Sequence, residues 1–216
     1  MIPWLDPEQP PCFPDTRQAL DNPDGLLAAG GKLSSDWLLS AYQQGIFPWF
    51  GTNSPILWWS PAHRTVLLPD KFHTSRSLAR LARQNRYHIT CNQDFQQVIQ
   101  HCAMPRRQQQ ETWITADMIK AYTAMHEIGI GQSFECRDQQ ERLVGGIYGL
   151  VIGRIFFGES MFSLHPNTSK LCLKHIMECG SFDLLDCQLA TRHLMSLGAI
   201  EISRETFEQW LAEANQ

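Results

Sequence analysis

Two short polar runs follow apolar stretches in this sequence: Gly158-Glu159-Ser160-Met161-Phe162-Ser163 and Leu185-Asp186-Cys187-Gln188. A strand that is buried on both faces seldom ends in ionisable side chains, because an unpaired buried carboxylate costs several kcal/mol. We therefore predict that the two runs meet at one site, where a ligand binds or a reaction takes place.

The residues around these runs predict alternating strands and helices. The expected strands cover residues 133–137, 143–151 and 154–159, which form a meander, and then 182–188 and 200–202. The expected helices cover residues 169–179 and 191–197, and a terminal helix starts at Glu205. A meander followed by alternating helices and strands is typical of an α+β fold.

The first part of the chain has a different composition. It begins with a Pro-rich segment, continues with a helix predicted at residues 36–42, and then has two Trp-containing segments that end near residue 61. Longer elements follow, with helices predicted at residues 75–84, 93–102 and 116–128. We therefore predict a small N-terminal domain (residues 1–62) and a larger C-terminal domain (residues 63–216).

Composition indicates a globular protein of a reducing compartment. The 216 residues carry a net charge of −4, and the seven cysteines form no Cys-x-x-Cys pair. The first residues lack a signal pattern, and no apolar run is long enough to span a membrane. The eight histidines have no metal-ligand spacing. We therefore predict a cytoplasmic location, reduced thiols and no metal site.

Positive charge is concentrated in one segment despite the net negative charge. Arg76, Arg80 and Arg83 would share one face of the predicted helix, and Arg86 follows. Such a face can hold the phosphates of a nucleic acid without reading its sequence. The alternative is a solvated helix face that serves solubility only.

The residue types in the two polar runs suit acid-base chemistry. Asp186 and Gln188 are two apart in a predicted strand, so both side chains are expected on the same face. A carboxylate beside a carboxamide can take a proton or orient a nucleophile. The alternative is a structural hydrogen-bonded pair. Glu159 and Ser160 are open in the same way, because a glutamate at the end of a strand can instead only cap the helix that follows.

The Trp-containing segments suggest a stacking surface. Trp49 follows a proline in a loop, which favours partial exposure, so its ring could stack on a base; Trp58 and Trp59 are expected in the core. The run Gly30-Gly31-Lys32-Leu33-Ser34 looks like a phosphate-binding loop, but its spacing is one residue too long and Leu33 replaces the required Ser or Thr.

Eight blocks of the sequence resemble, in the same order, those of the bacterial leucyl/phenylalanyl-tRNA-protein transferases. The blocks are Asn22-Pro23-Asp24-Gly25-Leu26-Leu27-Ala28, Ala41-Tyr42-Gln43-Gln44-Gly45-Ile46-Phe47-Pro48-Trp49-Phe50, Leu57-Trp58-Trp59-Ser60-Pro61, Thr112-Trp113-Ile114-Thr115, Leu143-Val144-Gly145-Gly146-Ile147-Tyr148-Gly149, Gly158-Glu159-Ser160-Met161-Phe162-Ser163, Leu185-Asp186-Cys187-Gln188 and Ser196-Leu197-Gly198-Ala199. They extend from about residue 20 to residue 200.

The resemblance implies a C-terminal domain with the acetyltransferase-like (GNAT) fold. It also implies a reaction: Leu, Phe or Met moves from aminoacyl-tRNA to the α-amino group of a protein that begins with Arg or Lys, which marks that protein for degradation under the N-end rule. The implied enzyme is a monomeric leucyltransferase that needs no metal or coenzyme. Aminolysis of an activated ester is downhill and mainly requires alignment and stabilisation of the developing oxyanion.

The resemblance also assigns roles to residues. Asp186 and Gln188 match the pair that activates the amine, and Glu159 matches a catalytic-site carboxylate that helps hold the aminoacyl-adenosine. Trp49, Trp113 and Ser160 are expected to contact the aminoacyl-adenosine. The apolar side-chain pocket is expected to contain Ile147, Phe156, Met161, Leu173 and Leu185.

Two other functions fit parts of the sequence. An acyl-CoA N-acetyltransferase would need a pyrophosphate loop after the central strand, which residues 159–166 do not offer. A non-catalytic tRNA-binding module would use the arginines and Trp49, with Asp186 only holding the core. The chain also departs from the family's longer members by its short C-terminus and by Ile147 at a position that is often Met, which leaves the preference among Leu, Phe and Met open.

Overall fold

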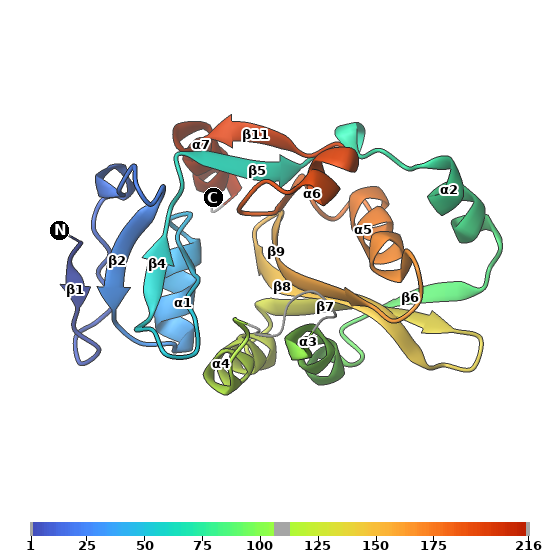
Figure 1. Cartoon of the computed structure of the whole chain (residues 1–216), viewed down its shortest axis with the longest axis horizontal. Helices are drawn as coiled ribbons and strands as arrows, with labels where there is room; N and C mark the ends of the chain where they lie inside the picture. Colours follow the sequence, from blue (N-terminus) through green and yellow to red (C-terminus); the bar gives the residue numbers. More distant parts are fainter. Residues whose placement is uncertain (1, 106–112, 215–216) are drawn as a thin grey trace.

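The computed structural model describes residues 2–105 and 113–214 (Figure 1). Thr112, part of one of the blocks quoted above, lies outside the described residues. Among the described helices, none has the length and apolar character needed to cross a bilayer. All seven cysteines are free thiols.

A small sheet and one helix form the N-terminal part of the chain. The strands lie in the order β1-β2-β4-β3 and the helix α1 packs against them. Their bounds are β1 Trp4–Leu5, β2 Leu26–Gly30, β3 Phe47–Pro48, β4 Leu57–Trp59 and α1 Ser35–Tyr42. Trp58 is fully buried and its indole nitrogen donates to the carbonyl of Gly30 at 2.9 Å, which confirms it as a core residue.

A seven-stranded sheet forms the rest of the described fold, with the strand order β11-β5-β10-β9-β8-β7-β6. Only β9 and β10 are parallel; the other neighbours are antiparallel. The bounds are β5 His63–Leu67, β6 Tyr87–Cys91, β7 Gly131–Asp138, β8 Leu143–Ile152, β9 Ile155–Ser163, β10 Leu184–Asp186 and β11 Ile200–Ser203. The first sheet ends at Trp59 and the second begins at His63, so the boundary predicted at residue 62 falls in the connection between the sheets.

Helices cover both faces of the large sheet. On one face, α5 packs against the strands and α2 packs on α5 (Figure 1). The other face meets α3, α4, α7 and the N-terminal part, whose apolar side chains join the same core. The bounds are α2 Arg76–Arg83, α3 Phe95–Ala103, α4 Ala116–Glu127, α5 Thr168–Glu178, α6 Arg192–Ser196 and α7 Arg204–Ala214, with 3-10 turns η1 Thr16–Gln18 and η2 Pro69–Lys71.

The mixed α and β composition and the predicted meander, now β7, β8 and β9, are confirmed. Two strands of the large sheet, β5 and β6, are absent from the prediction. β5 carries a buried charged residue, which breaks the apolar alternation that marks a strand. β6 does alternate apolar Tyr87, Ile89 and Cys91 with polar His88 and Thr90, so its strand signal is present in the sequence. The strand expected at residues 182–188 is shorter than predicted, because β10 ends at Asp186.

A buried ion pair holds the centre of the structure together. The guanidinium of Arg64 donates from Nε and Nη2 to the two carboxylate oxygens of Asp186, at 2.8 and 2.7 Å, and its Nη1 donates to the carbonyl of Gly45 at 3.0 Å. Its Cζ atom lies 4.7 Å from the ring centres of both Phe47 and Phe207. The Arg64 side chain is 2% exposed and Asp186 is 0% exposed. This pair therefore joins β5, β10, α7 and the N-terminal sheet.

Replacement of Arg64 by leucine is expected to lower the free energy of unfolding by roughly 3 to 5 kcal/mol, because the carboxylate of Asp186 would stay buried without its partner. Urea unfolding at pH 7 measures the loss. The matched control is Arg154→Leu, which breaks the exposed pair of Arg154 with Asp183 and should cost less than about 1 kcal/mol. Equal losses in the two variants would contradict the central role of the buried pair.

Candidate functional site

The site lies where β9 and β10 part. The two strands pair from Ile155 to Phe157 and from Leu184 to Asp186, and there the pairing stops. β9 continues along β8 to Ser163, whereas the chain after Asp186 stays with β5 through backbone bonds between Thr65 and residues 187 and 188. The separation opens a space between the two polar runs of the sequence, so their predicted meeting at one place is correct.

A β-bulge sets the direction of Glu159. Tyr148 pairs with Ser160 and Gly149 pairs with Gly158, so Glu159 is the extra residue of β9 and has no partner on β8. A Cβ atom on Gly149 would lie 2.0 Å from the carbonyl oxygen of Phe157, so only glycine fits opposite the bulge. Bulges redirect side chains next to functional sites. Here the carboxylate is turned toward α1 and α4.

Two tyrosines hold the carboxylate of Glu159. The hydroxyl of Tyr42 donates to Oε1 at 2.6 Å, the hydroxyl of Tyr122 donates to Oε2 at 2.9 Å, and the two hydroxyl oxygens are 2.5 Å apart. Burial raises the pKa of Glu159 to about 7, although the two phenol hydrogen bonds act to lower it. Burial also raises the pKa of both tyrosines, so they stay protonated donors. Glu159 can therefore accept or release a proton near neutral pH.

Asp186 and Gln188 are in contact, but not for the reason predicted. Gln188 lies beyond the strand with a φ of 58°, so strand alternation does not place the two side chains on one face. Instead, the backbone N–H of Gln188 donates to Oδ1 of Asp186 at 3.0 Å, and its side-chain Nε2 donates to Oδ2 at 3.3 Å. Together with Arg64, these donors occupy the carboxylate, which is closed to solvent.

Two adjoining cavities open at this place. The first, here called the apolar cavity, has a volume of about 390 Å³. It is lined by Ile147, Gly158, Glu159, Ser160, Met161, Leu173, Leu185, Cys187, Gln188, Thr191, His193 and Leu194. The second, the tryptophan cavity, has a volume of about 220 Å³. It is lined by Phe47, Pro48, Trp49, Trp113, Glu159, Cys187, Gln188, Leu189, Thr191 and Leu194. Glu159 and Gln188 line both.

Most of the residues predicted for catalysis, the aminoacyl-adenosine and the side-chain pocket lie around these cavities, and two of them, Phe156 and Asp186, do not. Trp49, which is 44% exposed, faces the same cavity as Trp113. Phe156, expected in the apolar pocket, instead lies in the core with its ring against Phe134 and Phe182. Asp186 lines neither cavity and lies behind Gln188.

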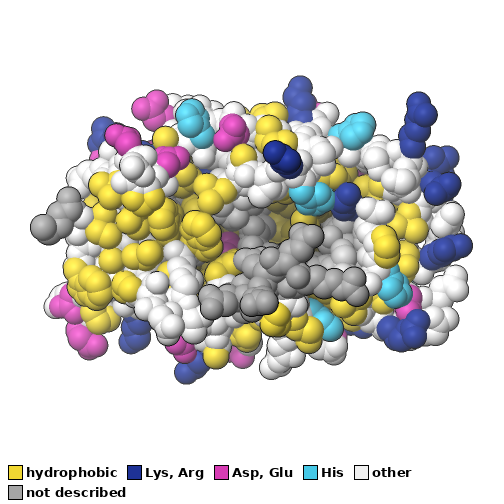
Figure 2. Space-filling model, viewed as in Figure 1, with side chains coloured by type: hydrophobic (Ala, Val, Ile, Leu, Met, Phe, Trp, Pro, Cys, Tyr) yellow, Lys and Arg dark blue, Asp and Glu magenta, His cyan; other side chains and the backbone are white. Residues whose placement is uncertain are grey.

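The arginines of α2 lie away from both cavities. Arg76, Arg80, Arg83 and Arg86 are exposed, and Lys and Arg side chains gather at the end of the molecule where α2 lies (Figure 2). α5 lies between them and the site, because it contributes Leu173 to the apolar cavity and packs on α2. Arg64, which precedes this positive segment in the sequence, is by contrast buried in the core.

Three residues of the site escaped the sequence interpretation. Arg64 was hidden among surface arginines, and Tyr42 and Tyr122 come from helices with no polar run. The one available signal was Tyr42, which lies in the second quoted block. These three side chains reach the site because their helices and strand pack beside β9 and β10 in the fold, although they are far from Glu159 and Asp186 in the sequence.

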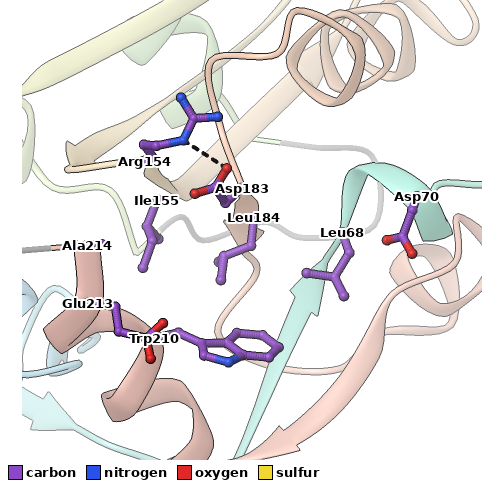
Figure 3. A pocket seen from close by; sticks show the side chains of 9 residues that line it. All are labelled: Leu68, Asp70, Arg154, Ile155, Asp183, Leu184, Trp210, Glu213 and Ala214. Carbon is purple, nitrogen blue, oxygen red and sulfur yellow. Dashed lines mark hydrogen bonds and ion pairs between the residues drawn. The ribbon is translucent and has the colours of Figure 1, made fainter.

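Two further observations delimit the site. A separate cavity of about 500 Å³, lined by Leu68, Ile155, Leu184, Trp210 and others beside the Arg154–Asp183 pair, contains none of the predicted site residues (Figure 3). Within residues 2–105 and 113–214, no group of three or more His, Cys, Asp or Glu side chains is arranged to hold a metal ion.

Known proteins were compared with the chain. A family model described as "Leucyl/phenylalanyl-tRNA protein transferase" matches residues 66–212, and one for the N-terminal domain of that family matches residues 31–62. The leucyl/phenylalanyl-tRNA-protein transferase of Cellvibrio japonicus (strain Ueda107) is 51% identical over 214 residues, which cover 98% of this chain and 90% of that protein. The protein of the same name from Pseudomonas syringae pv. syringae (strain B728a) is 51% identical over 216 residues, covering 98% and 93%.

A solved structure gives a much weaker likeness. A conserved protein of unknown function from Staphylococcus epidermidis ATCC 12228 aligns with 82% of this chain and 68% of its own. The TM-score is 0.45 and the sequence identity is 9%. The family models and the relatives, by contrast, extend over nearly the whole sequence, in agreement with the resemblance found in its motifs. The chain therefore belongs to the leucyl/phenylalanyl-tRNA protein transferase family of aminoacyltransferase enzymes.

Proposed function

We propose that the enzyme transfers Leu, Phe or Met from aminoacyl-tRNA to the α-amino group of proteins that begin with Arg or Lys, and so marks them for degradation. The observation that carries the proposal is the pair of adjoining cavities. One has apolar walls that suit an amino-acid side chain, and the other has two tryptophans that suit an adenine.

The tryptophan cavity suits the terminal adenosine of tRNA. The base of an unpaired 3′ end can stack on an aromatic ring, with a gain of about 1 to 3 kcal/mol per base. Trp49 offers an accessible ring on a fixed loop, because its carbonyl accepts a hydrogen bond from the indole of Trp59 at 2.7 Å. Trp113 faces the same cavity from the segment that leads into α4.

The apolar cavity suits an apolar amino-acid side chain that is not branched at Cβ, such as Leu, Phe or Met. Ile147, Met161, Leu173 and Leu185 form its apolar walls. A methionine wall can adapt to Leu, Phe and Met, whereas the fixed walls disfavour β-branched side chains by shape. Ser160, at the rim of the same cavity, is proposed to contact the aminoacyl-adenosine.

The residues shared by the two cavities mark the position of the reacting ester. In the proposed reaction the acceptor amine attacks the ester carbonyl, a C–N bond forms, and the C–O bond to the ribose breaks. Glu159 would take the proton lost by the amine, and the released ribose oxygen would gain one. Gln188 would orient the reacting groups, and Asp186 would act by positioning Gln188, since its carboxylate is enclosed.

Several wider features complete the proposal. The arginines of α2 would hold tRNA phosphates without reading sequence. The parting of parallel β9 and β10 suits a GNAT-like catalytic domain over residues 63–216, beside a small domain over residues 1–62. The free thiols suit a cytoplasmic enzyme, which we propose to be a monomer that uses no coenzyme. A binding module without catalysis is disfavoured by membership of an enzyme family.

Transfer of labelled leucine from Leu-tRNA is expected to reach peptides that begin with Arg or Lys and not a matched peptide that begins with Ala.

Trp49→Ala is expected to raise the KM for Leu-tRNA about tenfold, because the terminal base loses the ring on which it stacks. Initial rates at varied Leu-tRNA concentration measure both effects.

Trp4→Ala is the matched control for this experiment. Trp4 is also an exposed tryptophan, 69% exposed, but it lies on β1 at the outer strand of the small sheet. Its replacement should leave the KM within twofold of wild type. Equal changes in the two variants would remove Trp49 from the tRNA contact, and transfer to the Ala peptide would refute the acceptor rule.

The stability of the protein is expected to depend on the ionisation of Glu159. Its pKa is about 7 in the folded state and near 4.5 in the unfolded chain, so the folded state holds the proton more tightly. The resulting stabilisation is complete below pH 4.5 and is lost as pH rises to 7, by up to about 3 kcal/mol. The difference in unfolding free energy between wild type and Glu159→Gln, measured from pH 4 to 8, should follow this trend; a difference that is constant with pH would contradict it.

A further inference from the structure

A third cavity adjoins the site on the side of the N-terminal sheet. It has a volume of about 910 Å³, large for a ligand site, and is here called the polar cavity. Three segments form it: the connection from β2 to α1, the loop that precedes β4, and the first turns of α4. Its lining residues are Gly31, Lys32, Leu33, Ser34, Ser35, Phe50, Thr52, Ser54, Pro55, Ile56, Thr115, Ala116, Asp117, Lys120, Ala121 and Ala124.

The polar cavity continues from the tryptophan cavity along two segments of the chain. Trp49 lines the tryptophan cavity and the next residue, Phe50, lines the polar cavity. In the same way Trp113 lines the tryptophan cavity and Thr115 lines the polar cavity. α1 and α4, which lie side by side in Figure 1, bring these two segments together. The apolar and tryptophan cavities share lining residues, and the polar cavity follows the tryptophan cavity at the next residues of these two segments.

The lining of the polar cavity suits a single-stranded nucleic acid. Lys32 and Lys120 are exposed and reach it from two different elements, so they can meet neighbouring phosphates. Phe50 supplies a partly buried ring, and aromatic rings are the usual platform for unpaired bases. Side-chain hydroxyls for ribose and phosphate contacts come from Ser34, Ser35, Thr52, Ser54 and Thr115.

Two carboxylates limit the positive charge. Asp117 lines the cavity, and Asp36 at the start of α1 accepts a hydrogen bond from the hydroxyl of Ser34. With its two lysines the site is therefore close to neutral, and reversal of either lysine would make it negative. This makes the lysines the sensitive positions for an experiment.

We propose that the polar cavity holds the two unpaired nucleotides that precede the terminal adenosine of the tRNA. The inference rests on the proposed function and adds a subsite to it. The donor is bonded in the order amino acid, adenosine, preceding nucleotides, and the three cavities adjoin in the same order. The arginines of α2 lie beyond α5 on the other side of the apolar cavity, so they contact other parts of the tRNA. Lys32 belongs to the run that resembles a phosphate-binding loop. In this proposal it contacts a phosphate of the tRNA through its side chain, and not as part of such a loop.

Donors of different length test the subsite. Transfer to a peptide that begins with Arg is measured with two donors, leucyl-adenosine and the leucylated trinucleotide CCA. The donor ratio is kcat/KM for the trinucleotide divided by kcat/KM for leucyl-adenosine. We expect a ratio of ten or more for wild type, because the added nucleotides gain phosphate and stacking contacts. Lys32→Glu and Lys120→Glu are each expected to lower the ratio at least fivefold, and added KCl should lower the wild-type ratio.

Two controls separate this subsite from other effects of charge. Lys71→Glu reverses an exposed lysine on η2, outside all three cavities, and should leave the ratio within twofold of wild type. The double variant Arg76→Glu with Arg80→Glu should reduce transfer from full-length Leu-tRNA and leave the trinucleotide ratio unchanged.

The outcomes distinguish the subsite from the reaction itself. A wild-type ratio near one, or a ratio that the Lys32 and Lys120 variants do not change, would overturn the subsite while transfer from leucyl-adenosine still supported the proposed function. If the α2 double variant lowered the ratio and the lysine variants did not, the two nucleotides would lie on the α2 side of the apolar cavity. That result would also overturn the subsite. No transfer from any donor, full-length Leu-tRNA included, would overturn both.

Discussion

The bidentate ion pair between Arg64 and Asp186 is the interaction on which the rest of the structure depends. Arg64 reaches it from β5 and Asp186 from β10, and the same guanidinium binds the Gly45 carbonyl of the N-terminal part and packs between two aromatic rings. The second partner of Asp186 is Gln188, at the site. The pair therefore couples the positions of both parts of the chain to the geometry of the candidate site. Because a buried ion pair contributes little net stability, we interpret its value as one of positioning.

The site itself results from two departures from regular sheet structure. β9 leaves β10 after three paired residues, and Glu159 forms a bulge two residues beyond the last pair. The first departure makes room for cavities in the middle of a sheet. The second turns a carboxylate into a partly closed space, where two phenols hold it and its pKa is raised to about 7. The fold thus gives up sheet hydrogen bonds at the place where it gains a group that can exchange a proton near neutral pH.

Much of this could be predicted from the sequence, and the failures have physical causes. The helices and the meander follow from capping residues, glycines and apolar periodicity, which are local properties. β5 was not predicted, because its pattern contains an arginine whose burial depends on Asp186, a residue 122 positions away. Phe156 was assigned to the pocket because its apolar character does not reveal how deeply it is buried. It belongs to the same core cluster as the pocket residues Ile147, Leu173 and Leu185, but its ring packs in the core beside the cavity and does not line it.

The sequence by itself determined the family, the order of most elements, and the two polar runs that mark the site. These are properties of residue type and spacing, and the motif blocks carry them without reference to a structure. Only the tertiary structure decided which side chains meet. It enclosed Asp186, brought Tyr42 and Tyr122 to Glu159, and placed the apolar cavity beside the tryptophan cavity. The physical reason is that burial, hydrogen bonding and pKa are set by neighbours in space, and those neighbours come from strands and helices far apart in the sequence.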